Sequence, residues 1–446
     1  MTFASLGLIE PLLRTLDSLD YKTPTAVQAQ AIVPILQGRD LMAAAQTGTG
    51  KTAGFALPVL QRLMMEGPEV ASNSVRALVL VPTRELAEQV LQSFITYGQH
   101  LPLRSFAAYG GVSINPQMMK LRKGVDVLVA TPGRLLDLYR QKAVKFNQVQ
   151  TLVLDEADRM LDLGFASELE NVFRVLPKTR QTLLFSATFS DAIRDMAGEM
   201  LNDPLSIEVS PRNAAAKSVK QWLIPVDKKR KGELFLHLYQ TKRWSQALVF
   251  VKTRKGVDEL DAELQRRGIS ADSIHGDKPQ ATRQRALQRF KDGEVKVLVA
   301  TDVAARGLDI DDMPLVVNFD LPTVAEDYVH RIGRTGRAGA VGQAVSLVCA
   351  DEVQLLSAIE TLTQQVLQRV DEPDFIPDHR VPQTLPGGQV VKKSKKAKKP
   401  KVVGGGKGGS LGRWMEADAP AAPAVKAVRK VPSFGGKAGK PGKFVK

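Results

Sequence analysis

Several features that would mark particular classes of protein are scarce in this chain. Its 446 residues include a single cysteine, Cys349, so an internal disulfide scaffold and an all-cysteine zinc site are excluded. No apolar run approaches the roughly 18 residues that a membrane-spanning helix needs. Residues 1–10 have neither the basic flank nor the apolar core of a secretory signal. We therefore expect a soluble, intracellular, cytoplasmic protein.

The net charge of +15 is distributed unevenly along the chain. Residues 381–446 contain 16 Lys and Arg against Glu416 and Asp418, so they carry +14 and the first 380 residues carry +1. The same stretch has 12 Gly and 7 Pro, a composition that cannot bury enough apolar surface to offset the entropy of ordering it. We predict a disordered Lys/Gly/Pro-rich basic tail over residues 371–446, with lysines densest in 392–401.

The rest of the chain alternates short apolar runs with amphipathic stretches, which predicts strand–helix–strand units and a doubly wound α/β fold. Runs of about four to six apolar residues are typical of parallel strands buried on both faces. The predicted strands cover residues 41–44, 77–81, 125–130, 151–154, 182–185, 247–251, 295–300, 315–319 and 344–348. The clearest helical patterns cover residues 85–97, 255–267 and 283–290. We predict two similar domains, 1–209 and 221–370, joined by a linker at 210–220.

A phosphate-binding loop is predicted at residues 45–52, which read A-Q-T-G-T-G-K-T between an apolar strand and a helical pattern. Glycines at this position let backbone N–H groups surround phosphate oxygens. Lys51 would reach the β- and γ-phosphates, and Thr52 would ligate Mg²⁺. The predicted nucleotide contacts are Ala45, Gln46, Thr47, Gly48, Thr49, Gly50, Lys51 and Thr52. Ala45 stands where the general pattern has glycine, and Pro58 falls inside the following helix, so an ordinary glycine-rich turn is the alternative.

Acidic residues follow the strand at 151–154, in the sequence T-L-V-L-D-E-A-D. Ligands of open parallel sheets bind at the carboxyl ends of the strands, where these carboxylates would lie. Asp155 would hold Mg²⁺ through water, because this ion loses its hydration shell reluctantly. Glu156 would orient and deprotonate an attacking water. The alternative is a solvated acidic loop.

These motifs, in this order, resemble the DEAD-box ATP-dependent RNA helicases of superfamily 2, over about residues 1–370. The resemblance also implies two RecA-like domains, each a mostly parallel sheet with helices on both faces. Within the family, D-E-A-D-R-M-L-D and the compact N-terminus most resemble the bacterial RhlE-type branch. The other matching segments are the Q motif at 21–28 with Phe3 upstream, P-T-R-E-L-A at 82–87, Gly110–Gly111, T-P-G-R at 131–134, S-A-T at 186–188, V-F-V-K-T at 249–253, Gln280 with Arg283, A-T-D-V-A-A-R-G-L-D at 300–309 and H-R-I-G-R-T-G-R at 330–337.

The resemblance implies further contacts to the nucleotide. Tyr21 would stack on adenine, and Gln28 would hydrogen-bond the adenine edge, for which a side-chain amide is suited. Asp309 would accept hydrogen bonds from the ribose. Arg334 and Arg337 would act with Lys51, Asp155 and Glu156 as catalytic residues, reaching the phosphates as arginine fingers. A core aromatic and a solvated basic turn are the alternatives for Tyr21 and for the two arginines.

For RNA, the resemblance implies contacts through hydroxyls, arginines and a glycine, which bind phosphates and sugars and give little sequence preference. The candidate RNA-binding residues are Thr83, Arg84, Gly111, Thr131, Arg134 and Thr301. Ser186, Thr188 and His330 would couple the nucleotide site to RNA, although a buried structural histidine is the alternative for His330. The 2′-hydroxyl would supply part of the distinction from DNA.

We therefore expect an ATP- and Mg²⁺-dependent enzyme that locally and non-processively unwinds or remodels RNA duplexes and RNA–protein complexes. Ribosome assembly or RNA turnover is the expected setting, with ribosomal or RNA-degradation proteins as partners. The basic tail is expected to tether RNA; a solubilising tail or a nuclear import signal are alternatives. A DNA helicase and an ATP-gated RNA clamp are the alternative functions, and the Q motif argues against the first.

Overall fold

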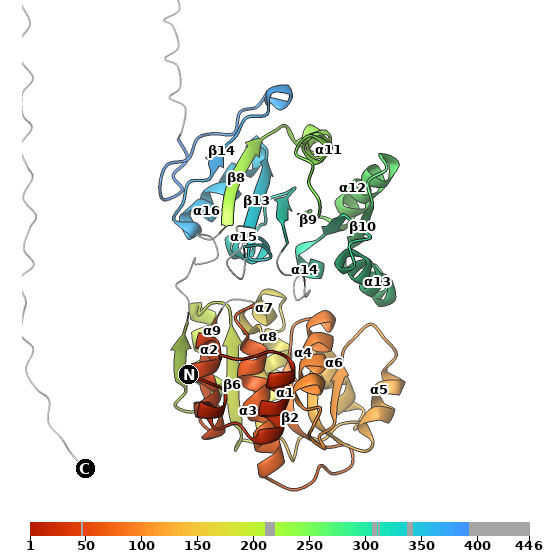
Figure 1. The fold of residues 1–446 in the computed structure, drawn as a ribbon, viewed down its shortest axis with the longest axis vertical. Helices are drawn as coiled ribbons and strands as arrows, with labels where there is room; N and C mark the ends of the chain where they lie inside the picture. Colours follow the sequence, from red (N-terminus) through yellow and green to blue (C-terminus); the bar gives the residue numbers. More distant parts are fainter. Residues whose placement is uncertain (46–47, 210–218, 306–309, 311–312, 337–341, 392–446) are drawn as a thin grey trace, which may run out of the picture. The chain divides into compact units, whose positions relative to one another are not determined.

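The computed structural model describes residues 1–45, 48–209, 219–305, 310, 313–336 and 342–391. Within these ranges the chain forms two seven-stranded sheets, and every strand pair is parallel (Figure 1). This confirms the predicted α/β fold with two RecA-like domains. Several predicted features lie outside the described residues: Gln46, Thr47, Asp309, Arg337, linker residues 210–218 and tail residues 392–446.

The first sheet has the strand order β3-β4-β2-β5-β6-β1-β7. Its strands are β1 (Leu41–Ala44), β2 (Val75–Leu80), β3 (Ser105–Ala108), β4 (Val125–Ala130), β5 (Thr151–Leu154), β6 (Gln181–Ser186) and β7 (Leu205–Glu208). The helices are η1 (Ala4–Leu6), α1 (Glu10–Ser18), α2 (Ala26–Leu36), α3 (Lys51–Met65), α4 (Arg84–Tyr97), α5 (Ile114–Leu121), α6 (Pro132–Arg140), α7 (Ala157–Asp162), α8 (Ala166–Val175) and α9 (Asp191–Met200).

Helices cover both faces of the first sheet, which is why its central strands are apolar at consecutive positions. Alternate strand residues such as Ala43 and Val79 join one core with α1, α2, α3 and α4. Their neighbours Met42 and Leu80 join the other core with α6, α7, α8 and α9. Pro58 lies inside α3, which nevertheless continues to Met65 because its residues pack into the core.

The second sheet has the order β10-β11-β9-β12-β13-β8-β14, which repeats the first order position by position. Its strands are β8 (Val219–Pro225), β9 (Ala247–Phe250), β10 (Ala271–Ile274), β11 (Val297–Ala300), β12 (Leu315–Asn318), β13 (Gly342–Val348) and β14 (Gln368–Arg369). The helices are η2 (Lys228–Arg230), α11 (Lys231–Thr241), α12 (Arg254–Arg266), α13 (Gln280–Lys291), α14 (Asp302–Ala305), α15 (Ala325–Ile332), η3 (Ala350–Glu352), α16 (Val353–Thr363) and η4 (Pro373–Phe375).

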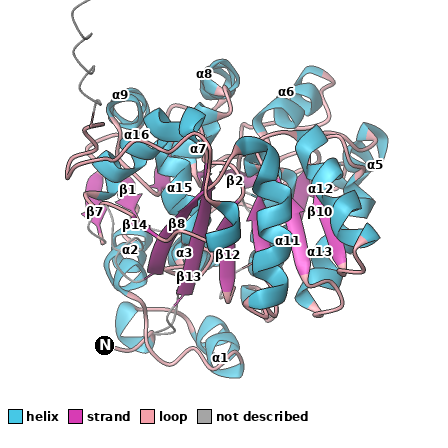
Figure 2. Ribbon diagram, turned by 90° about the horizontal axis from the view of Figure 1, so that it is seen from above, coloured by secondary structure: helices cyan, strands magenta, loops and turns pink. Residues whose placement is uncertain are grey.

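This sheet also has a core on each face, and Figure 2 shows strands lying between helices. Helices α13, α15 and α16 supply one core, and α11 and α12 supply the other. The predicted linker extends to residue 220, but Val219 and Lys220 already pair with β13 as the start of β8.

Residues 371–391 differ from the disorder predicted for them. Phe375 is 7% exposed and Val381 is 5% exposed, and each joins one of the two cores of the second sheet. The guanidinium of Arg369 donates to the carbonyls of Val381 and Pro382 at 2.8 and 2.7 Å. The folded part of the second half therefore continues beyond residue 370. None of the helices in the described ranges is long and apolar enough to cross a membrane.

Candidate active site

The phosphate loop lies between β1 and α3, as the sequence predicts. Ala45 is buried and its N–H donates to the carbonyl of Ser186 at 3.0 Å, so it continues the pairing of β1 and needs no glycine. Gly50 precedes α3 with φ 85°, a left-handed conformation. A Cβ there would lie 2.3 Å from Nε2 of Gln28, so both the backbone and the available space require glycine. The loop therefore leads into a helix N-terminus, which favours bound anions.

Gln28 holds this loop against the start of α2. Its Oε1 accepts from the Thr25 N–H at 2.9 Å, and its Nε2 donates to the Gly50 carbonyl at 3.0 Å. The side chain is only 4% exposed. The amide predicted to bind adenine is thus engaged at both ends with the protein itself.

Tyr21 is 44% exposed in the segment between α1 and α2, as expected of a loop aromatic. Its ring centroid lies 6.5 Å from that of Tyr97. Both tyrosines line a cavity of about 360 Å³ together with Thr52, the second residue of α3. The structure therefore brings the predicted adenine-stacking residue and a predicted Mg²⁺ ligand to one cavity.

The two carboxylates predicted after β5 differ sharply in their electrostatics. Asp155 is 3% exposed; burial raises its pKa to about 6, although the nearby Lys51 lowers it. Burial would also raise the pKa of Glu156, but the positive charges of Arg159, Lys51 and Arg334 outweigh it and lower the value to about 2. Both carboxylates lie within electrostatic reach of Lys51, so loop and acidic residues meet at one sheet edge, as predicted.

The last acidic residue of the motif, Asp158, connects β5 to β6. Its Oδ2 accepts from the backbone N–H groups of Ala187 and Thr188 at 3.0 and 3.2 Å and from the Thr188 hydroxyl at 3.4 Å. Ser186 is fully buried, and its hydroxyl donates to the Thr188 carbonyl at 2.8 Å. Two of the predicted coupling residues are therefore tied to the acidic motif. The sequence predicts no role for Asp158. Its place at the end of the D-E-A-D motif is the signal that indicates a function.

Five of the six candidate RNA-binding residues gather after adjacent strands of the first sheet. Thr131 directly follows β4 and precedes α6, Thr83 lies between β2 and α4, and Gly111 lies shortly after β3. Gly111 has φ 77°, a left-handed conformation that favours glycine, and the guanidinium of Arg84 lies against its backbone. Arg134 donates through Nη2 to the Val112 carbonyl at 2.8 Å.

Arg134 has unused hydrogen-bonding capacity. Its Nε and Nη1 are buried and have no hydrogen-bond partner among the described residues. Such groups are rare in folded proteins and need a partner. An anionic oxygen would supply one.

The second half contributes the remaining candidates. Arg334 is 6% exposed, and its charge acts on Glu156 as described above. His330 lies in α15 with Nδ1 3.9 Å from a carboxylate oxygen of Asp327. Thr301 directly follows β11 and is 7% exposed.

An ion pair that was not predicted as part of the site joins the two halves. Nη2 of Arg283, in α13, lies 2.7 Å from Oε1 of Glu85, in α4, and both side chains are about nine-tenths buried. Arg283 was recognised in the sequence as part of a motif. Its partner, almost 200 residues earlier, carries no local signal of the contact.

Two family models match the chain. Residues 25–196 match the DEAD/DEAH box helicase model, and residues 230–339 match the helicase conserved C-terminal domain model. The DEAD-box ATP-dependent RNA helicase CshA of Bacillus cereus is 43% identical over 372 residues, which are 83% of this chain and 70% of the relative. The ATP-dependent RNA helicase CshA of Listeria monocytogenes is 41% identical over 375 residues, 84% of this chain and 71% of the relative.

Two solved structures of helicases bound to RNA resemble this chain in fold. Dbp5 of S. cerevisiae bound to RNA and ADP BeF3 aligns with a TM-score of 0.75 and 34% identity, covering 84% of this chain and 96% of that one. The DEAD-box helicase Mss116 bound to ssRNA and UDP-BeF aligns with a TM-score of 0.76 and 28% identity, covering 83% and 80%. The predicted RhlE-type branch is not supported, because the two relatives described above are CshA proteins.

Proposed function

We propose a working cycle for this chain from one premise: it belongs to the DEAD-box family of ATP-dependent RNA helicases. It is accordingly an RNA-dependent ATPase and helicase that uses ATP. In the proposed cycle, ATP hydrolysis drives local, non-processive separation or remodelling of RNA duplexes and RNA–protein complexes. The observation that carries the cycle is the meeting of Lys51, Asp155 and Glu156 at one sheet edge.

In this proposal the first half binds the nucleotide. Backbone N–H groups of the loop at 45–52 and the ammonium of Lys51 would hold the phosphates. Tyr21 would stack on adenine, and Asp309 would accept from the ribose. Gln28 would bind adenine through the second N–H of Nε2 and the second lone pair of Oε1 while it keeps its contacts with Gly50 and Thr25, so ATP binding would be coupled to the position of the loop.

The residues at this edge also fit Mg²⁺. Among the described residues no group of three or more His, Cys, Asp or Glu forms a cage for a metal. Mg²⁺ does not need one, because it is commonly held by one or two carboxylates, water and substrate phosphates. Asp155 and the Thr52 hydroxyl offer suitable oxygen ligands. When bound, the ion would neutralise charge that develops on the phosphates.

Glu156 would position the attacking water. Its carboxylate is ionised at neutral pH and can accept a hydrogen bond from that water. Arg334 and Arg337, from the second half, would stabilise negative charge in the transition state. Because the catalytic groups come from both halves, hydrolysis would require the halves to close about the linker at 210–220.

RNA would bind to both halves and so favour the same closed state as ATP. Thr83, Arg84, Gly111, Thr131, Arg134 and Thr301 would contact phosphates and sugars. The unpartnered Nε and Nη1 of Arg134 support an anionic ligand at this place. Two ligands that favour one state strengthen each other's binding by the same factor. The contacts of Asp158 with Thr188 would transmit closure between the sites, with Ser186 and His330 as further coupling residues.

The experiment that tests this function compares ATP hydrolysis by the full chain without nucleic acid, with single-stranded DNA and with RNA. We expect RNA alone to raise kcat strongly. Equal stimulation by DNA would contradict the RNA assignment. Strand separation of a short duplex, measured in parallel, distinguishes a helicase from an ATP-gated clamp, which would bind RNA without separating strands.

The wider setting we propose is ribosome assembly or RNA turnover in the cytoplasm, with ribosomal or RNA-degradation proteins as partners. Contacts to sugars and phosphates support a substrate range defined by structure more than by sequence. We further propose that the basic residues of 392–446 tether RNA, since they hold 16 Lys and Arg against two acidic residues.

A further inference from the structure

The second sheet has a cavity of about 500 Å³ at the amino ends of its strands. Lys220 and Gln343 are each the second residue of their strand, and Leu315 begins β12. The candidate catalytic and RNA-binding residues lie at the carboxyl ends. None of those residues lines this cavity, so it is separate from the site described above.

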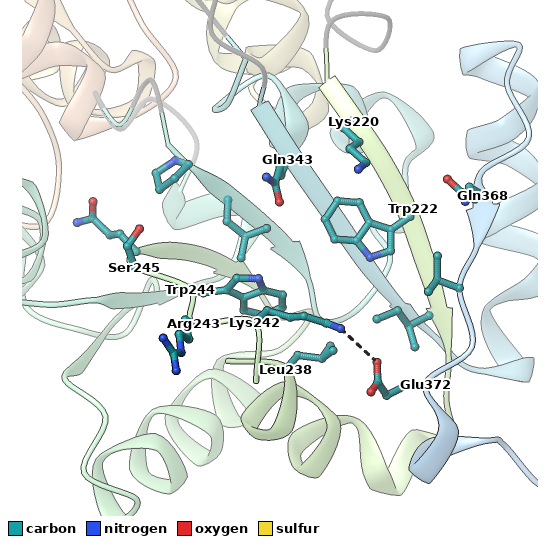
Figure 3. A pocket seen from close by; sticks show the side chains of 15 residues that line it. Lys220, Trp222, Leu238, Lys242, Arg243, Trp244, Ser245, Gln343, Gln368 and Glu372 are labelled. Atoms are coloured by element: carbon teal, nitrogen blue, oxygen red, sulfur yellow. Dashed lines mark ion pairs between the residues drawn. The ribbon is translucent and has the colours of Figure 1, made fainter. Parts of the chain in front are cut away.

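The cavity exists because α11 stops short of the end of the sheet. The helix ends at Thr241, and the chain turns back toward β9 through Arg243, whose φ is +50°. Residues of β8, β13 and β14 line the cavity beside this turn. Trp222 on β8 pairs with Gln368 on β14, and Figure 3 shows both lining the cavity.

Two tryptophans, of the three in the whole chain, line this space. Trp222 projects from β8, and Trp244 lies on the segment between α11 and β9 (Figure 3). Trp244 is braced by Phe235, with ring centroids 6.0 Å apart. In the described part of the chain, no ring packs against Trp222 and neither indole N–H has a hydrogen-bond partner.

The cations around the cavity exceed the acidic groups. Lys220, Lys242 and Arg243 line it, and Glu372 is the acidic residue of the lining. Glu372 lies 4.0 Å from Lys242 and 3.1 Å from a ring nitrogen of His237. Lys220 and Arg243 form no ion pair within the described ranges. Two positive charges therefore remain for a ligand.

We propose that this cavity binds an unpaired base of single-stranded RNA, which stacks on Trp222 and Trp244 while Lys220 and Arg243 contact the adjoining phosphates. A nucleotide combines a planar apolar face, a hydrogen-bonding edge and an anion. The cavity offers a complement to each: indole rings, the amides of residues such as Gln343, and unpaired cations. Aromatic rings beside basic side chains are the usual means of binding single strands without sequence preference. An apolar peptide would leave the cations unused.

The site would hold a single-stranded extension of the RNA while the opposite end of the domain acts on the duplex. It is independent of the catalytic cycle proposed above, because it does not require ATP or closure of the two halves. The indole rings, amides and cations of the cavity also suit a free mononucleotide, so the test must distinguish the binding of a mononucleotide from the binding of RNA.

The test measures binding of a fluorescent oligouridylate to the full chain without nucleotide. Trp222→Leu keeps an apolar side chain over the core but removes the stacking surface. Stacking contributes roughly 1–3 kcal/mol per base, so we expect affinity to fall about five-fold or more. The logarithm of the RNA-binding constant falls linearly with the logarithm of the salt concentration, and Lys220→Gln should reduce the magnitude of this salt slope by about 0.7. RNA containing 4-thiouridine should cross-link to peptides that hold Trp222 or Trp244.

Arg243→Gly controls for folding, because a left-handed backbone favours glycine. This variant should be at least as stable as the parent and still bind RNA more weakly. Lys229→Gln is the matched charge control, because Lys229 is exposed in η2, before α11, and does not line the cavity.

Wild-type affinity in both Trp222→Leu and Arg243→Gly, with no cross-link to the cavity, would overturn the proposal. Competition by uridine monophosphate at the same molar concentration as the oligonucleotide would also overturn it in favour of a mononucleotide site. RNA-stimulated ATP hydrolysis by these variants, measured separately, reports on the catalytic site and should keep its parent kcat.

Discussion

Glu156 combines a left-handed backbone, at φ 53°, with a carboxylate held by Arg159. Such a conformation costs a residue other than glycine roughly 1 kcal/mol, and here it places the side chain beside Lys51 and the phosphate loop. The backbone conformation that holds this carboxylate at the sheet edge therefore lowers the stability of the fold slightly.

Replacing Glu156 by glutamine should separate binding from turnover. The amide keeps the size of the side chain and an oxygen for Arg159, but it cannot serve as the charged acceptor of a water proton. We expect ATP and RNA to bind nearly as in the parent chain while kcat falls about 100-fold or more. Equilibrium binding and single-turnover hydrolysis measure the two effects. An unchanged kcat would remove Glu156 from its proposed role.

Gln28 offers a second test at the scale of one residue. Gln28→Glu keeps an oxygen for the Thr25 N–H but loses the donor to the Gly50 carbonyl, whereas Gln28→Ala loses both contacts. Leaving a partner of a buried hydrogen bond unsatisfied costs about 1–3 kcal/mol. We expect the glutamate variant to bind ATP roughly ten-fold more weakly. Its helix content, measured by circular dichroism, should equal that of the parent chain. ATP affinity equal to that of the parent would show that this contact does not shape the loop.

At the scale of elements, the central strands could be predicted and several others could not. Strands β4 and β5 have the predicted bounds, because consecutive apolar residues identify a strand covered on both faces. Five strands were missed: β3, β7, β8, β10 and β14. Of these, β3, β7, β10 and β14 lie at sheet edges, and β8 is next to one. Burial there is partial or alternating, so the apolar signal is weak.

The segment at 371–391 also behaves as an element of the second half. Deleting residues 371–446 removes Phe375 and Val381 from two cores, and each fully buried side chain contributes about 1.5–3 kcal/mol. Deleting only residues 392–446 leaves both in place. We expect the longer deletion, and not the shorter one, to lower the free energy of unfolding by roughly 3 kcal/mol. Urea denaturation of the two truncated chains measures the difference; equal midpoints would contradict it.

At the scale of the whole molecule, the charge distribution predicts that residues 1–391 hydrolyse ATP and that the basic residues of 392–446 add affinity for RNA. The shorter deletion leaves a body that is nearly neutral, so we expect its maximal RNA-stimulated rate of ATP hydrolysis to remain. RNA affinity should fall, and if the six lysines at 392–399 each neutralise one phosphate, the salt slope should lose roughly 4 in magnitude. Anisotropy titrations at several salt concentrations test this. An unchanged slope would show that the basic residues do not touch RNA.

How much of the site the sequence could reveal depends on the distance between contacting residues. The phosphate loop and the acidic motif are local patterns, and each carries its own chemistry. The Gln28–Gly50, Asp158–Thr188 and Glu85–Arg283 contacts join residues far apart in the chain. No local pattern in the sequence indicates such pairs, so they are recognised only in the folded structure.

The repeated strand order of the two sheets has a consequence for the number of nucleotides that the chain binds. β8 occupies the place of β1, and Lys231 begins α11 as Lys51 begins α3. Lys231, 2% exposed, lies 3.0 Å from Asp320, just beyond β12, the counterpart of β5, and 2.8 Å from Glu352. Two carboxylates thus pair with the lysine that begins the helix after the first strand of the second sheet.

We therefore expect the second half to bind no nucleotide beside Lys231, because its ammonium is already paired with two carboxylates. Calorimetric titration should give one ATP per chain. Lys231→Met should destabilise the protein by about 3 kcal/mol, because it removes the cation between two partly buried carboxylates, and leave that stoichiometry at one. Lys51→Met should abolish ATP binding with little loss of stability. A second equivalent of bound ATP would contradict this expectation and show that the ion pairs of Lys231 do not exclude a nucleotide.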